Sequence, residues 1–232
     1  MVQMRDNAAA APRPSLVDAA YAALKRAIRD TALAPGYQGS EQEIALQLGM
    51  SRTPVHEAVI RLQEEGLVRV LPRRGVLVCA LSPEDMREIY EVIVALESAA
   101  AALIAAQPKK QRKPVATALE AVNAAMAAAL AAEDLPAWAE ADGRFHQMLV
   151  EGAGNARLVR IYAGIMDQSH RARMLTLRLR PRPILSVQEH AGILAAIRAG
   201  AEAEALARAK AHRQRAVAQI LPLLAQLGMR QI

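Results

Sequence analysis

The chain has 232 residues, of which 53% are hydrophobic and 22% are charged, and its formal net charge is +6. This composition excludes a disordered chain, because such chains have few apolar residues for their net charge. The single cysteine, Cys79, excludes an intrachain disulfide and agrees with a reducing, cytoplasmic location. We expect helices to dominate, because aromatic residues are scarce and alanine, the strongest helix former, is abundant.

Residues 1–14 have no apolar signal-peptide core, and we expect them to form a flexible tail. Residues 15–80 then mix short helical patterns with turn signals. Ser40 and Ser51 are N-cap candidates, and Gly66 follows the third helical pattern. The expected elements are helices over Leu16–Arg29, Glu41–Leu48 and Arg52–Glu65, and a two-stranded hairpin of Leu67–Leu71 and Val76–Cys79. Three helices and a hairpin form the pattern of a winged helix-turn-helix.

Residues 83–230 are predicted to form an all-helical antiparallel bundle, so the fold class is mainly α. Lys109–Lys113 is expected to be a solvated basic loop, and Asp134 and Ser186 are cap candidates. No apolar run reaches the ~20 residues of a membrane span, since Glu97 interrupts Val92–Ala106. The expected helices are Pro83–Ala106, Pro114–Ala132, Leu135–Ala153, Ala156–Thr176, Ser186–Ala199 and Ala201–Leu227.

The break at Gly49-Met50-Ser51 between two short helices is typical of a helix-turn-helix, whose second helix enters the major groove of double-stranded DNA by its N-terminal end. Arg52 can donate two hydrogen bonds to guanine there. Bulk charge does not predict DNA binding, since residues 15–80 hold eight Lys/Arg and seven Asp/Glu. The alternative is an ordinary helical cluster with solvated arginines. The candidate DNA-binding residues are Ser51, Arg52, Thr53, His56, Arg73 and Arg74.

Four residues of the C-terminal segment have side chains that bind metals. Asp142 and His146 are four residues apart and therefore project from the same face of a predicted helix. His190 and His212 lie on later predicted helices. One aspartate and three histidines suit a divalent ion such as Zn²⁺, Ni²⁺, Mn²⁺ or Fe²⁺. Spacing alone does not bring these helices together, and histidines with ordinary partners remain the alternative.

Three runs make residues 15–79 resemble the GntR family of bacterial transcription regulators: Gly49–Val59, Leu62–Val68 and Pro72–Gly75. The resemblance implies a homodimer, most often a repressor, that binds a palindromic operator. This chain departs from the family at three positions. His56 stands where an Arg is usual, Gly39 where a Leu is common and Thr31 where a Gly is frequent.

Residues 83–227 resemble the ligand domain of FadR-type regulators, the FCD domain. The resemblance lies in Asp142–His146, Gly154-Asn155, Glu189–Leu194 and His212. It implies that Asp142, His146, His190 and His212 bind a divalent metal that is not catalytic and that receives a small organic acid effector. Candidate effector-binding residues are Arg171, Arg173 and Asn155.

The family pattern Tyr-Glu-x-Arg has Ile93 in place of its arginine, which puts a dicarboxylate or sugar-acid effector in doubt. The resemblance then favours a less charged effector, held by the metal and apolar walls. Together, the two resemblances make a ligand-responsive DNA-binding regulator, and not an enzyme, the leading hypothesis. One alternative is a helical metalloenzyme, although no obvious general base accompanies the four residues. The other is a helical domain that only dimerises.

Overall fold

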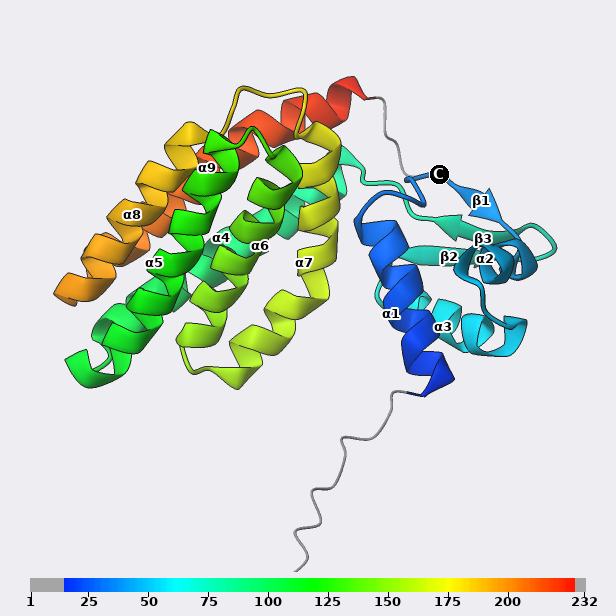
Figure 1. Cartoon of the computed structure of the whole chain (residues 1–232), viewed down its shortest axis with the longest axis horizontal. Coiled ribbons are helices and arrows are strands. Elements are labelled where there is room, and N and C mark those ends of the chain that lie inside the picture. Colours follow the sequence, from blue (N-terminus) through cyan, green and yellow to red (C-terminus); the bar gives the residue numbers. More distant parts are fainter. Residues whose placement is uncertain (1–14, 228–232) are drawn as a thin grey trace, which may run out of the picture.

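A computed structural model describes residues 15–227. The predicted tail at 1–14 and the last residues of the predicted 83–230 segment lie outside the described range. Figure 1 places a small N-terminal part beside a larger helical bundle, with α1 (Leu16–Arg29) facing α7 (Ala156–Thr176) of the bundle. The fold is mainly helical, as predicted.

The N-terminal part contains α1, α2 (Glu41–Leu48) and α3 (Arg52–Glu64), packed on a small antiparallel sheet. The strands are β1 (Gln38–Gly39), β2 (Val68–Leu71) and β3 (Gly75–Val78), in the order β1-β3-β2. The hairpin of β2 and β3 was predicted, but the third strand, β1, was not. A Cβ atom on Gly75 would lie 2.4 Å from the Gly39 carbonyl oxygen, so glycine at position 75 allows β1 to approach β3.

The structure explains two of the departures from the family pattern. Thr31 has a φ of 61°, in the left-handed region that glycine adopts without strain. Gly39 is buried under Tyr37, because a Cβ atom on Gly39 would lie 2.6 Å from the Tyr37 hydroxyl oxygen. The Tyr37 ring therefore occupies the space next to position 39.

Four predicted helix caps had different outcomes. Ser40 forms a complete capping box with Glu43, and the Asp134 side chain accepts from the Ala137 N–H. Ser51 lies at the N-cap position of α3 but makes no capping hydrogen bond. Ser186 does not cap a helix, because α8 begins two residues earlier, at Ile184.

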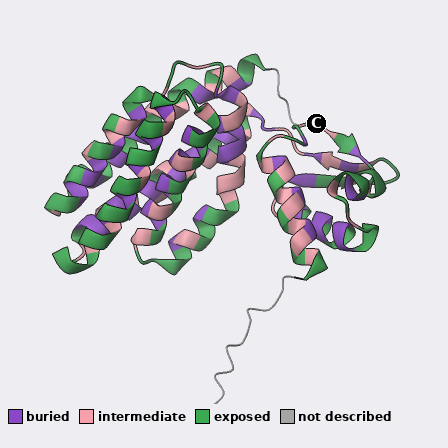
Figure 2. Ribbon diagram, viewed as in Figure 1, coloured by how far each residue is buried: buried purple, intermediate pink, exposed green. Residues whose placement is uncertain are grey.

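The C-terminal part is a bundle in which α4 packs along α9, and α5 lies between α6 and α8. Apolar side chains from all these helices form its core, and Figure 2 shows the buried residues on the inward faces. The remaining helices are α4 (Pro83–Ala106), α5 (Lys109–Ala131), α6 (Leu135–Gly152), α8 (Ile184–Ala199) and α9 (Glu202–Gln226).

The basic segment Lys109–Lys113 is the beginning of α5, so the prediction of a loop there was wrong. Lysine, glutamine and arginine are good helix formers. Pro114 removes only one backbone hydrogen bond near the helix start, and the helix continues through it.

By length and composition, α4 and α5 could each cross a membrane, which the expectation from the sequence did not allow for. The inward side chains of α4 pack against α9, α6 and α7. Its apolar character is therefore explained by its place in the bundle core.

Candidate functional site

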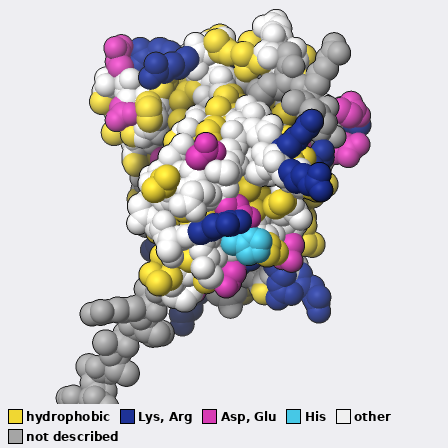
Figure 3. Space-filling view, turned by 90° about the vertical axis from the view of Figure 1, so that its right-hand side faces the viewer, with side chains coloured by type: hydrophobic (Ala, Val, Ile, Leu, Met, Phe, Trp, Pro, Cys, Tyr) yellow, Lys and Arg dark blue, Asp and Glu magenta, His cyan; other side chains and the backbone are white. Residues whose placement is uncertain are grey.

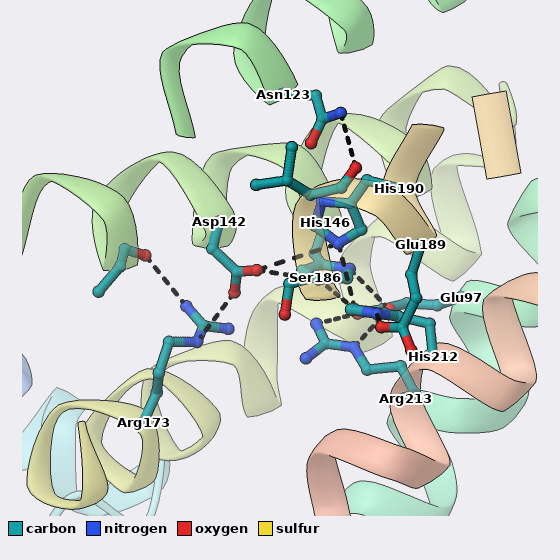
Figure 4. Close-up of polar contacts among 12 residues, drawn as sticks. Glu97, Asn123, Asp142, His146, Arg173, Ser186, Glu189, His190, His212 and Arg213 are labelled. Carbon is teal, nitrogen blue, oxygen red and sulfur yellow. Dashed lines mark hydrogen bonds and ion pairs between the residues drawn. The ribbon is translucent and has the colours of Figure 1, made fainter. Parts of the chain in front are cut away.

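The four predicted metal-binding residues come together in the bundle (Figure 4). α6 supplies Asp142 and His146, α8 supplies His190 and α9 supplies His212, and all four side chains are buried. The Nε2 atom of His212 lies 3.1 Å from Nε2 of His190 and 3.3 Å from Nε2 of His146. Oδ1 of Asp142 lies 3.7 Å from Nε2 of His146 and 3.9 Å from Nε2 of His190. We call these four residues the histidine cluster.

Two glutamates lie beside the outer nitrogen atoms of the cluster, with a hydrogen bond at His212 and an ion-pair contact at His146. Oε2 of Glu97 lies 2.9 Å from Nδ1 of His146, and Oε2 of Glu189 lies 2.6 Å from Nδ1 of His212. A carboxylate at Nδ1 favours the tautomer with the proton on Nδ1, which leaves a lone pair on Nε2. Burial lowers the pKa of His190 and of His212, so both rings are neutral. The His190 ring stacks on Phe145, with the ring centroids 3.8 Å apart.

The geometry of the cluster fits a divalent metal. The Nε2 atoms of three histidines and the Asp142 carboxylate face one another, and all four groups can bind a metal. Metal–nitrogen bonds of about 2.0–2.1 Å in a tetrahedral site place the nitrogen atoms about 3.3 Å apart. The observed Nε2 separations of 3.1 and 3.3 Å are close to this value. Two of the three Nε2 separations are therefore compatible with a tetrahedral metal site, and all three nitrogen atoms lie within 4.8 Å of one another.

Arg173 joins the cluster through Asp142. Its Nε atom lies 3.1 Å from Asp142 Oδ2. Burial opposes ionisation of Asp142, but the positive charge of Arg173 outweighs it, and the pKa of this carboxyl group is lowered well below its usual value. A Cβ atom on Gly143 would lie 3.1 Å from Arg173 Nη1, so a glycine in the middle of α6 leaves room for the guanidinium group.

Polar residues that the sequence did not single out surround the cluster. Glu97 is 1% exposed and accepts hydrogen bonds from Nε and Nη2 of Arg213, both at 2.6 Å, and from the Tyr162 hydroxyl. Arg215 pairs with Glu189 in the same way on the outer side of His212. One signal was present in the sequence: Glu97 is the acidic residue within the apolar run Val92–Ala106.

Two candidate effector-binding residues do not lie with the histidine cluster. Arg171 is fully buried, but it donates to the Cys79 carbonyl oxygen at 2.6 Å, at the junction with the N-terminal part. Residues two positions apart in a helix are separated by about 200° around its axis, so Arg171 and Arg173 point in nearly opposite directions. Asn155 is exposed and caps α7, accepting from the N–H groups of Arg157 and Leu158.

The candidate DNA-binding residues lie on the surface of the N-terminal part. Ser51, Arg52, Thr53 and His56 are exposed at the start of α3. Glu41 of α2, which the sequence analysis did not single out, lies 3.2 Å from Nε of Arg52 and 2.7 Å from Nδ1 of His56. It therefore orients both side chains.

Arg73 and Arg74 are exposed in the turn between β2 and β3, where the sequence placed them. The Gln38 side chain donates to the Arg74 carbonyl oxygen at 2.8 Å, which ties the turn to β1. On the face shown in Figure 3, Lys and Arg side chains are scattered among Asp and Glu. Among the described residues, this face therefore has no continuous basic surface (Figure 3).

Comparisons with known proteins agree with both parts of this fold. Residues 16–78 match the family of bacterial regulatory proteins called the gntR family, and residues 88–215 match the FCD domain. One relative, from Agrobacterium vitis, is an HTH-type transcriptional regulator in the TAR-I ttuE-ttuC′ intergenic region. It is 57% identical over 134 residues, which cover 58% of this chain and 78% of the relative.

A second relative is the HTH-type transcriptional repressor RspR of Escherichia coli (strain K12), which is 32% identical over 56% of each chain. Among solved structures, E. coli McbR/YncC superposes with a TM-score of 0.77 at 21% identity, over 93% of this chain and 99% of that chain. This last likeness concerns the fold alone. The two family matches together carry the assignment: the chain belongs to the GntR family of bacterial transcription regulators and carries an FCD domain, so it is a DNA-binding regulator and not an enzyme.

Proposed function

We propose that this regulator binds a palindromic operator in double-stranded DNA as a homodimer, acts as a repressor in the cytoplasm, and responds to a small organic acid at a metal ion in its FCD domain. The observation that carries the metal site is the convergence of three buried Nε2 atoms, with Nε2–Nε2 separations of 3.1 and 3.3 Å about His212.

Asp142, His146, His190 and His212 would hold the metal, and their donor set suits Zn²⁺, Ni²⁺, Mn²⁺ or Fe²⁺. When bound, the ion supplies a positive charge in a low-dielectric interior, where it attracts a carboxylate strongly. The protein residues position and insulate this charge. Glu97 and Glu189 hold the rings of His146 and His212 in the orientation that binding needs.

The contacts of α7 support a response at the DNA-binding part. Arg173 pairs with Asp142 in the histidine cluster. On the other side of the same helix, Asp167 lies 3.0 Å from the Lys25 ammonium group of α1, and Arg171 bonds to the Cys79 carbonyl oxygen. A ligand that shifts α7 would therefore change the contacts between α7 and the N-terminal part. An allosteric effector requires such contacts, which differ between two conformations of the protein.

The DNA-binding role rests on the exposed side chains at the start of α3 and at the β2–β3 turn. Arg52, whose side chain Glu41 orients, would read a base edge in the major groove. The helix N-terminus beside it favours a phosphate group. Arg73 and Arg74 would contact the DNA backbone and position the protein without reading sequence.

The metal is tested by elemental analysis of purified, dialysed protein. We expect about one divalent ion per chain in the wild type, and its loss in a His146→Ala/His190→Ala variant. A His56→Ala variant is the matched control, because His56 is exposed on α3 and far from the cluster in the fold. Absence of metal from wild-type protein, even after incubation with Zn²⁺, Ni²⁺ and Mn²⁺, would refute the proposal for the FCD domain.

A further inference from the structure

Four buried polar atoms without hydrogen-bond partners belong to residues that interact electrostatically with one another, and two of these residues also interact with Asp142 of the histidine cluster. They are the Tyr90 hydroxyl on α4, Nη2 of Arg173 on α7, and Nε and Nη2 of Arg180 on the connection between α7 and α8. By strict hydrogen-bond geometry none of these atoms has a partner within residues 15–227. The Ser169 hydroxyl is a close neighbour of the Tyr90 hydroxyl and lowers its pKa, against the larger effect of burial, which raises it. Such atoms are costly to bury, so their presence in one place indicates a missing group with acceptor atoms.

Arg180 reaches this place from outside the helices. The flanking residues 178, 179, 181 and 182 are exposed, whereas the Arg180 guanidinium group turns inward, with Cζ 5.8 Å from the centroid of the Trp138 ring. Burial lowers the pKa of Arg180, the charge of Arg173 lowers it further, and the Asp142 carboxylate opposes both. Arg180 therefore lies within the electrostatic reach of Asp142, a residue of the histidine cluster.

The charges around the cluster are not balanced. Arg173 pairs with Asp142, Arg213 with Glu97, and Arg215 with Glu189. Within the described part of the chain, Arg180 has no carboxylate at ion-pair distance, and its buried nitrogen atoms lack acceptors. A divalent metal on neutral histidines would add two further positive charges. An anionic ligand would neutralise these buried positive charges and so lower the free-energy cost of burying them.

We propose that Arg180, with the Tyr90 hydroxyl and Nη2 of Arg173, forms a second anion subsite and that the effector is a dicarboxylate. This inference rests on the proposed function: one carboxylate binds at the metal and the other at Arg180. The planar fork of a guanidinium group matches a carboxylate with two parallel hydrogen bonds.

The proposal changes the expectation drawn from Ile93. The sequence places an isoleucine where the family has an arginine on α4, and this put a dicarboxylate in doubt. In the structure Ile93 is a buried core residue, whereas a cation comes from the connection after α7. Because this connection is not helical, it can move to admit a ligand without unwinding a helix.

The test compares acids that differ only in the second carboxylate. Full-length protein loaded with Zn²⁺ is titrated calorimetrically with succinate and with butyrate, which have equal carbon numbers. The pairs malonate–propionate and glutarate–valerate cover shorter and longer spacings. We expect the best diacid to bind at least tenfold more tightly than its monoacid partner.

Two substitutions in the same connection separate the role of Arg180 from general effects. Arg180→Gln should abolish the preference for the diacid and leave the monoacid affinity within about twofold. Arg178→Gln is the matched control, because Arg178 is exposed, and it should keep the preference. Tyr90→Phe removes one donor and should weaken diacid binding only partly. Zinc content and melting temperature, measured for each variant, identify any that have lost the fold.

The outcomes distinguish this inference from the proposed function. If monoacids bind and diacids bind no better, or if Arg180→Gln keeps the diacid preference, the second subsite is refuted while the metal site stands. If the protein binds zinc but none of these acids, both the dicarboxylate and the wider organic acid proposal are overturned. If it binds no metal, the metal-based effector site fails, and the second subsite with it.

Discussion

Replacing Glu97 with glutamine tests how the interior of the bundle is held together. Glu97 is 1% exposed, and its two oxygen atoms contact Arg213, Tyr162 and His146. The positive charge of Arg213 overcomes burial and lowers the pKa of the Glu97 carboxyl group far below its usual value. The glutamate is therefore ionised at neutral pH, and its loss leaves the Arg213 charge buried without a counter-ion.

The expected cost follows from this burial. Removing one partner of a buried ion pair destabilises a protein by about 3–5 kcal/mol. Glutamine keeps the shape and one acceptor oxygen, so we expect a loss near the lower limit, about 3 kcal/mol in the free energy of unfolding. Urea denaturation followed by circular dichroism, with a chelator present so that metal binding does not contribute, measures this value.

A triple substitution separates stability from the orientation of His146. Glu97→Leu, Tyr162→Phe and Arg213→Met together replace the polar group with apolar side chains, which should restore stability to within about 1 kcal/mol of the wild type. Metal affinity should stay lower by about 10–100-fold, because His146 has lost the carboxylate at Nδ1. A loss below 1 kcal/mol in Glu97→Gln, or wild-type metal affinity in the triple variant, would refute this reasoning.

Further predictions concern the N-terminal part. Arg52→Ala should weaken operator binding by about 1–3 kcal/mol and relax sequence preference; equal affinity for all operator variants before and after the change would exclude base reading. Arg73→Ala with Arg74→Ala should weaken binding equally for all sequences and flatten its dependence on salt, whereas an unchanged salt slope in a binding titration would argue against phosphate contacts. Thr31→Gly should raise the free energy of unfolding by about 0.5–1 kcal/mol, because it relieves the positive φ of Thr31; a less stable variant in urea denaturation would contradict this account.

Local signals predicted most element boundaries. The capping box of Ser40 and Glu43 and the glycine after α2 set the limits of that helix through neighbouring backbone groups. The start of α5 was misplaced because a run of charged and polar side chains indicates a loop as readily as an exposed first turn, and the helix begins at Lys109. The strand β1 was missed because two residues carry no periodicity, and only the pairing with β3 defines it.

The candidate site required more than local patterns. Asp142 and His146 share a face of α6 by spacing alone, and the resemblance to a family pointed to His190 and His212. The direction of Arg171 and the ion pair of Arg173 with Asp142 were open until α7 had a defined rotation in the bundle. The role of Asn155 was simpler than the family pattern implied, because its side chain caps a helix.

The amino-acid sequence by itself determined the helices, the winged helix-turn-helix and the residue types of a metal site, since these depend on short-range periodicity, caps and spacing. The tertiary structure alone decided which charges balance one another. Glu97 and Arg213 are 116 positions apart in sequence, yet they form a buried pair, and Arg180 enters the same interior from a connection outside the helices. The physical reason is that the energy of a buried charge depends on neighbours brought by packing, which no local pattern specifies.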